Sequence, residues 1–381
     1  MIGTASILVG IVMQPVNWWS RTREKIWSGL LADRSIYVAA LAYFVACGGY
    51  VVARGAFDSG QLIDTVRLYA DMWWREYGVL FPLFLVEIGV IHVLLRLKER
   101  RRLGFRMMLG PERSGRLIAG SVLLLIMVPF HTSFNLIKNM IPLGQGFPFD
   151  HVFADFDKAL FFGHDPFTLL YAIGKQEWLL RVIELNYGNG WIIVTFGTLY
   201  WMAVSPRHDS IRSRYFVSFI LSWAIVGNVL ATIFSSAGPI YYGYVTGDFA
   251  RFGDQVAFLE TTVDAMGSSA MYQHYLWSLH LAGQPGLASG ISAFPSMHLA
   301  LVTLNALFIG EFKPKWAKWA WMYVAIIEVS SVYLGWHYAV DGFASIAIVF
   351  GIYWAVRRVM TSRLVWTRQR TEADTGVVAA D

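Results

Sequence analysis

The sequence predicts an all-α fold, a polytopic membrane helical bundle with about eight transmembrane helices. Of the 381 residues, 56% are hydrophobic, and the mean hydropathy is +0.48. Only 15% are charged, whereas a soluble domain usually carries about 25%. Several apolar runs reach the roughly 20 residues that cross a bilayer. We expect helices rather than strands, because alternating strand patterning is absent and lipid cannot satisfy exposed backbone groups.

The length and apolar character of each run place the individual spans. The predicted spans are 35–53, 78–97, 117–136, 183–204, 215–234, 297–312, 317–335 and 338–356. They divide the chain into an N-terminal segment with two extra transmembrane helices, a six-helix catalytic core and a cytoplasmic tail. The predicted boundaries are 1–116, 117–358 and 359–381. Met1–Val16 lacks a leading basic region and a cleavage site, so we expect an interfacial segment rather than a signal peptide.

The basic residues predict the orientation, because Lys and Arg favour cytoplasmic connections. Most of the 31 Lys and Arg residues fall in the termini and in alternate connections of the predicted bundle. The opposite side holds only a few: Arg54, Arg67, Arg75, Lys138, Lys158, Lys175, Arg181 and Arg251. Both termini are therefore expected in the cytoplasm, and the connections 139–182 and 235–296 outside it. The 16 Trp residues and the short loops favour a bacterial plasma membrane.

Composition also excludes some functions. Cys47 is the single cysteine, which rules out a disulfide framework and a cysteine metal site. The net charge of +5 is small and lies in the connections, so nucleic-acid binding is not expected. The expected partners are membrane lipids, and the sequence does not reveal the oligomeric state.

Two short stretches at the ends of predicted spans carry chemistry. The first is Phe294–His298, and the second is Gly335–Asp341. Ionisable residues beside a bilayer core are costly and suggest a functional site. His337 and Asp341 are four residues apart, so on a helix the carboxylate could hold one ring nitrogen and leave the other free to attack. Taken alone, the pair is equally compatible with a structural hydrogen bond.

His298 follows Pro295 and Ser296 at the expected start of a helix. Proline suits the first helical turn, and a helix N-terminus with free N–H groups favours anions. A histidine there can contact a phosphate oxygen or transfer a proton, but it can also simply cap a helix. Both stretches fall on the predicted non-cytoplasmic side.

Together, Phe-Pro-Ser-Met-His, one span, a basic turn, a second span and His-x3-Asp resemble the type 2 phosphatidic acid phosphatase superfamily. Within it, the chain is most similar to the inositol phosphorylceramide synthase branch, with Met297 where lipid phosphatases have glycine. The resemblance covers roughly 117–356. It implies a six-helix core, no metal and no cofactor. It also implies a phosphotransferase that moves a phosphorylated head group, such as inositol phosphate, from a phospholipid to a lipid alcohol such as ceramide.

The resemblance implies residue roles as well. His337 would attack phosphorus and form a phosphohistidine, Asp341 would orient it, and His298 would protonate the leaving oxygen. The residues implied in substrate binding are Ser296, Lys158, Asp157, Gly238, Pro239 and Tyr241.

The chain departs from the phosphatase pattern at two arginine positions. Ser331 stands where the pattern has Arg after Ser330, and Asp165 stands where it has Arg before Pro166. A dianionic phosphomonoester needs strong charge compensation, so these losses favour a phosphodiester donor and an acceptor other than water.

Three alternatives remain open from the sequence. A lipid phosphate phosphatase would use water as the acceptor. An intramembrane zinc hydrolase would use His298, His337 and Asp341 as ligands. A transporter would place ionisable groups near the midplane of repeated halves, but no repeat is visible here.

Overall fold

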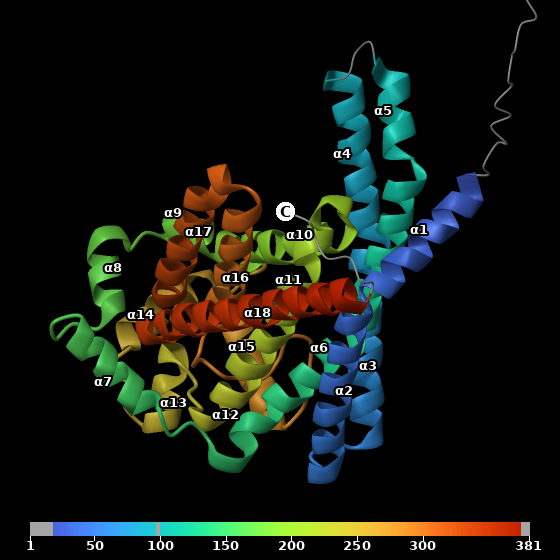
Figure 1. Ribbon diagram of the computed structural model, residues 1–381. Coiled ribbons are helices and arrows are strands. Elements are labelled where there is room, and N and C mark those ends of the chain that lie inside the picture. Colours follow the sequence, from blue (N-terminus) through green and yellow to red (C-terminus); the bar gives the residue numbers. More distant parts are fainter. Residues whose placement is uncertain (1–17, 97–99, 375–381) are drawn as a thin grey trace, which may run out of the picture.

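The computed structural model describes residues 18–96 and 100–374 (Figure 1). It is 83% helical, and the part of the chain that it describes contains no strand. This confirms the predicted all-α class. The predicted interfacial segment Met1–Val16 lies outside the described residues.

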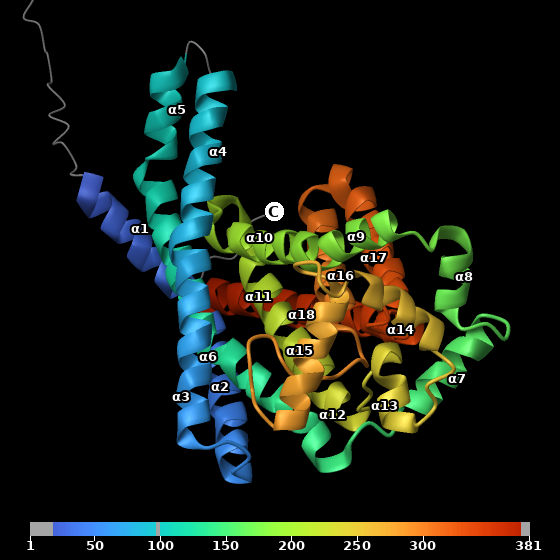
Figure 2. The ribbon, with the colours of Figure 1, turned by 180° about the vertical axis from the view of Figure 1, so that it is seen from behind.

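The N-terminal part is a set of helices that lean on one side of the core. Its helices are α1 (Trp18–Ala32), α2 (Arg34–Arg54), α3 (Ser59–Trp73), η1 (Trp74–Leu80), α4 (Phe81–Arg96) and α5 (Arg101–Met108). The start of α3 is fixed by a capping box between Asp58 and Gln61. From there α3, the π-helical η1 and α4 continue as one rod (Figure 2), and α4 and α5 reach beyond the rest of the bundle (Figure 1).

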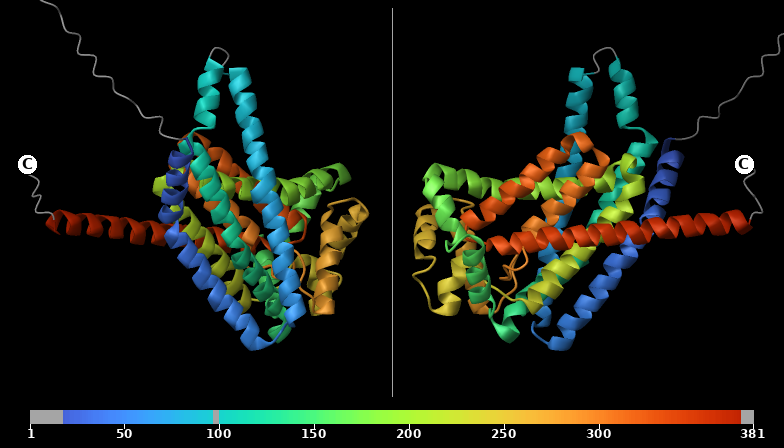
Figure 3. Two further views of the ribbon diagram at one scale, coloured as in Figure 1. Left: turned by 90° about the vertical axis from the view of Figure 1, so that its right-hand side faces the viewer. Right: turned by 60° about the vertical axis from the view of Figure 1, so that its left-hand side comes forward.

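The core consists of long apolar helices. They are α6 (Pro111–Gln145), α10 (Trp191–Val204), α11 (Asp209–Ala224), α16 (Met297–Phe312), α17 (Pro314–Tyr333) and α18 (Ala339–Asp374). Helix α16 packs against α10, α11, α17 and α18, and α6 packs against α1, α2, α3 and α10. Residues such as Leu299, Leu304, Tyr215 and Phe219 fill the space between them. Figure 3 shows the end of α18 extending away from this bundle.

Shorter helices connect or extend the core helices. They are α7 (Asp150–Leu160), α8 (Pro166–Gly174), α9 (Glu177–Leu185), η3 (Asn186–Gly190), η4 (Pro206–His208), η5 (Ile225–Leu230), α12 (Ala231–Ile233), η6 (Pro239–Tyr241), α13 (Tyr242–Thr246), α14 (Gly253–Leu259), η7 (Glu260–Thr262) and α15 (Ser269–Ala282). Most of them come from the two long connections that the sequence places outside the cytoplasm, 139–182 and 235–296. Their loops carry the residues that surround the site.

Five helical segments are long and apolar enough to cross a membrane: Arg34–Arg54, Ser59–Arg96, Arg101–Gln145, Ile211–Ile233 and Ala339–Thr361. Each contains or closely overlaps one predicted span. The predicted span 297–312 is a shorter apolar helix. The spans predicted at 183–204 and 317–335 are helical, but they are not among the five.

A buried ion cluster attaches the N-terminal helices to the core. Asp33, in the turn between α1 and α2, accepts a hydrogen bond of 2.5 Å from Arg116 of α6 and lies 3.8 Å from Arg212 of α11. Arg116 also donates to the carbonyl of Ala203 in α10. All three charged side chains are almost fully buried. Helices α6 and α11 therefore meet the N-terminal segment at one carboxylate, and Arg116 also holds α10.

Candidate active site

His337 lies in the turn between α17 and α18, where Gly335 has a positive φ of 67°. Its Nδ1 is 2.8 Å from the carbonyl oxygen of Ala293 and 3.3 Å from Oδ2 of Asp341. Because a carbonyl only accepts, Nδ1 carries the ring proton. The Nε2 atom then holds the free lone pair, which is the form that a nucleophilic histidine needs.

Burial keeps His337 neutral. The ring is 7% exposed. Burial lowers the pKa of His337 to about 3; the hydrogen bond to Ala293 opposes this shift, and the positive charge of Lys138 adds to it. The imidazole is therefore a neutral base over the physiological pH range.

His298 faces His337 across the start of α16, with the ring centroids 6.2 Å apart. Its ring stacks on Tyr187 at 4.3 Å and lies 4.1 Å from the ring of Trp191. These aromatic contacts fix the ring plane, while neither ring nitrogen hydrogen bonds to another residue that the structure describes. The second histidine is thus held in place but free to exchange a proton.

Ser296 connects the two histidines through the backbone. It is the N-cap of α16, and its hydroxyl accepts from the N–H of Leu299. Its own N–H donates to the carbonyl of Asp341. The peptide bond between Phe294 and Pro295 just before it is cis. The fully buried Ser296 therefore ties the N-terminus of α16 to that of α18.

Asp157 of α7 holds the start of α18. Its Oδ2 accepts from the N–H of Ala339 at 2.6 Å, and its Oδ1 accepts from the N–H of Val340 at 2.9 Å. Both oxygens thus face the positive end of the helix that follows His337. Burial raises the pKa of Asp157 to about 6, against the effect of the two backbone hydrogen bonds.

Asp150 was not anticipated from the sequence. This buried carboxylate accepts from the backbone N–H groups of Ala237 and Gly238 and from the hydroxyl of Tyr338. Gly238 has a positive φ of 97°, and a Cβ there would lie 2.7 Å from the carbonyl oxygen of Trp336. Asp150 therefore fixes a close contact between the Gly238 loop and the His337 turn. The sequence offers one indication of this role: Asp150 is an acidic residue that follows Gly144 and Gly146 after a long apolar span.

The other residues predicted to bind substrate lie in different surroundings. Pro239 lines a small cavity together with His337, Tyr338, Asp157 and other residues. The hydroxyl of Tyr241 donates to the carbonyl of Gln273, and this hydrogen bond involves neither His298 nor His337. Lys158 is exposed on α7.

The two arginine positions of the phosphatase pattern carry no positive charge. Ser331 is buried and donates to the carbonyl of Glu328. Asp165 is paired with Arg251, with Nη2 and Oδ1 2.9 Å apart. Arg251 also donates to Asp155 and to the carbonyl of Ala154. All three nitrogens of the Arg251 guanidinium therefore donate to protein groups.

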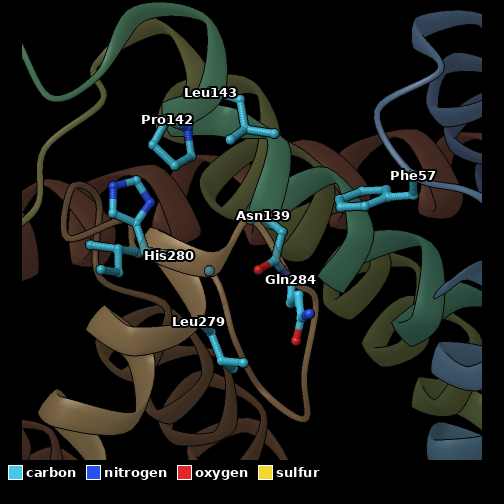
Figure 4. Close-up of a pocket in the computed structure, with 10 residues that line it drawn as sticks. Phe57, Asn139, Pro142, Leu143, Leu279, His280 and Gln284 are labelled. Atoms are coloured by element: carbon cyan, nitrogen blue, oxygen red, sulfur yellow. The ribbon is translucent and has the colours of Figure 1, made fainter.

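A second cavity, shown in Figure 4, is lined by neither His298 nor His337. It is lined by Phe57, Asn139, Pro142, Leu143, Leu279, His280, Gly283, Gln284, Gly290 and Ile291. It opens where the end of α6 meets the loop that leads to Ala293. Among the described residues, no group of three or more His, Cys, Asp or Glu side chains is arranged to hold a metal ion.

The comparisons with known proteins support one family. No curated protein and no solved structure matches the chain. The family model of the PAP2 superfamily matches residues 151–355, which is more than half of the chain and includes both histidines and Asp341. The chain therefore belongs to the PAP2 superfamily, whose members are phosphatases and phosphotransferases.

Proposed function

We propose that the protein is an integral membrane lipid phosphotransferase. It moves a phosphorylated polar head group, such as inositol phosphate, from a phospholipid to a lipid alcohol through a phosphohistidine on His337. The observation that carries this proposal is the pair of rings 6.2 Å apart, one with its Nδ1 proton fixed by Ala293. One phosphoryl group between them would contact a nucleophile on one side and a proton donor on the other.

In the first step, Nε2 of His337 attacks phosphorus and the bond from phosphorus to the glycerol oxygen breaks. The negative charge of the bound phosphodiester favours a proton on the ring of His298. His298 gives this proton to the leaving oxygen, so diacylglycerol leaves as a neutral alcohol. The head group remains attached through an N–P bond. Proton transfer of this kind contributes on the order of 10²–10⁴-fold.

In the second step, neutral His298 takes the proton of the acceptor hydroxyl. The acceptor oxygen attacks phosphorus, and the N–P bond breaks. Both histidines return to their starting states. Asp341, Asp157 and Asp150 act as positioning residues in this scheme. Asp341 contacts Nδ1 of His337, Asp157 accepts from the backbone N–H of Ala339, and Asp150 accepts from the hydroxyl of Tyr338.

The second candidate is a lipid phosphate phosphatase with water as the acceptor. The replacement of the two arginine positions by Ser331 and Asp165 favours transfer from a phosphodiester, because a dianionic monoester would meet less positive charge here. Product analysis separates the two: a new phospholipid indicates transfer, and free phosphate indicates hydrolysis by a phosphatase.

We further propose that the site faces the non-cytoplasmic side. The support is the charge asymmetry of the sequence and the covering of the histidines by helices from the two connections expected there. A reagent that cannot cross the membrane would test this orientation on a single cysteine placed at exposed Phe162, in a chain with Cys47 replaced by alanine.

The test of function uses the full chain, purified in detergent and incubated with phosphatidylinositol labelled in the inositol ring and with ceramide. Wild-type protein should form a labelled sphingolipid, and acid quenching should release label from the protein. His337→Ala should lose both signals, while the exposed control His164→Ala retains them. Undiminished product from His337→Ala would reject the nucleophile.

A further inference from the structure

Lys138 is a cation at the site for which sequence reasoning found no role. It lies near the end of α6, between Asn135 and Asn139. These two asparagines hydrogen bond to Ser289. The neighbouring Gly290 lies so close that a Cβ on it would be 2.9 Å from Cγ of Lys138. The loop that leads to Ala293 and His298 is therefore seated directly on this lysine.

The ammonium group has no protein partner among the described residues, since it takes part in no ion pair or hydrogen bond there. Lys138 is only partly exposed. The loop seated on Lys138 continues to Ala293, whose carbonyl oxygen is 2.8 Å from Nδ1 of His337. The positive charge of Lys138 is near enough to act on the electrostatics of both His337 and His298. A lysine that only extends to the membrane surface would be exposed. A partly buried charge without a partner is costly, so an anion is expected beside it.

Arg251 is paired with carboxylates, and Lys158 is exposed to solvent, so neither is available to bind a phosphate at the histidines. Arg251 is bound by Asp165 and Asp155. Lys158, at the lysine position of the phosphatase pattern, is exposed on α7. Asp341 and Asp157 add negative charge close to His337.

We propose that the ammonium group of Lys138 binds the phosphate that His337 attacks, and that its single charge selects phosphodiester monoanions over phosphomonoester dianions. This inference rests on the proposed function and names its substrate class. Lys138 supplies one permanent positive charge, which balances one phosphodiester, because the proton on His298 leaves with the alcohol in the first step. A monoester would bring a second negative charge toward Asp341 and Asp157, where no further free Lys or Arg among the residues that the structure describes compensates it.

The experiment compares Lys138→Met and Lys138→Arg with the exposed control Lys175→Met. Each purified full-length protein is assayed with phosphatidylinositol and with phosphatidic acid in mixed detergent micelles. Wild-type protein should prefer phosphatidylinositol. Lys138→Met should lower kcat/KM for it by about 10-fold to 100-fold, the usual effect of removing one charged hydrogen bond. Lys138→Arg should recover most of this loss, and Lys175→Met should stay within about twofold of wild type.

Thermal unfolding gives a second readout. Methionine removes a charge that has no partner, so Lys138→Met should melt at the same temperature as wild type or higher. Inorganic phosphate should raise the melting temperature of wild type but not of Lys138→Met. Wild-type kcat/KM in Lys138→Met, or an equal phosphate effect in both proteins, would overturn the assignment. If wild type acts on neither lipid, the proposed function fails, while the phosphate measurement still decides the role of Lys138.

Discussion

Two clusters of buried charge lie near opposite ends of α6, and they differ in how their charges are paired. Arg116 and Lys138 are separated along this helix by about 33 Å at 1.5 Å per residue. At the first end, Asp33 is bound by Arg116 and lies beside Arg212, and the two arginines also donate to backbone carbonyls. At the second end, Lys138 has no partner in the described chain, and Oδ1 of Asp341 accepts no hydrogen bond.

This difference in pairing indicates that the first cluster stabilises the fold and the second serves the reaction. A buried charge that is paired and hydrogen-bonded contributes to the folded state only as long as its partners remain. A buried charge without a partner lowers stability, and it is retained where a ligand or a reaction uses it. Loss of a charge should therefore lower the stability of the protein at the first end, and lower turnover without unfolding at the second.

The largest effect is expected for His298→Gln. Without the proton donor, kcat/KM for phosphatidylinositol should fall by on the order of 10²–10⁴-fold, while the melting temperature changes little. The matched control is His151→Gln, an exposed residue of α7, which should keep wild-type turnover. A parallel loss of melting temperature would instead show that the ring between Tyr187 and Trp191 matters for packing.

Asp33→Asn should produce the opposite pattern. It leaves Arg116 and Arg212 without their carboxylate, and breaking a buried pair costs about 3–5 kcal/mol. Unfolding of the purified protein in detergent measures the loss, and turnover per folded molecule should be unchanged. Asp64→Asn is the control, because its pair with Arg67 is exposed and such pairs contribute at most about 1 kcal/mol. Equal losses in both variants would remove the distinction between the two clusters.

A smaller effect is expected from the pH dependence of Asp157. The pKa of Asp157 is raised to about 6, and that of His337 is lowered to about 3. As the pH falls below 6, Asp157 takes up a proton and loses an acceptor for the N-terminus of α18, while His337 stays neutral. Hence kcat/KM should fall on the acid side of pH 6. Asp157→Asn should lower kcat/KM about tenfold and abolish this acid limb; an unchanged profile would assign the limb to another group.

The sequence predicted the helical class and the residues of the paired motifs, because apolar length and residue spacing are local properties. It did not predict what holds His337. The shorter contact of Nδ1 is the backbone carbonyl of Ala293, which is 44 residues away along the chain. Backbone acceptors have no sequence signature. Lys138 and Asp150 were missed for a related reason, since their importance depends on which groups the fold leaves unpaired or brings together.

Glu328 sharpens the comparison and should show the smallest effect. Both of its carboxylate oxygens are buried without a hydrogen-bond partner in the described chain, and a Cβ on Gly342 would clash with one of them. It lies one residue after Ile327 on α17, facing the helix that carries Asp341. Unlike Lys138, Glu328 is not expected to bind a phosphate, because its carboxyl group and the phosphate are both acidic. Glu328→Gln keeps the shape and removes the charge, so we expect a stability change within about 1 kcal/mol, on the stabilising side, and turnover within about twofold of wild type. Unfolding and the phosphatidylinositol assay measure the two quantities in the same preparation. A large loss of turnover in this variant would mean that an unpaired acid on α17 takes part in the proton transfers. The reactive group of residues around His298 and His337 would then include Glu328 of α17.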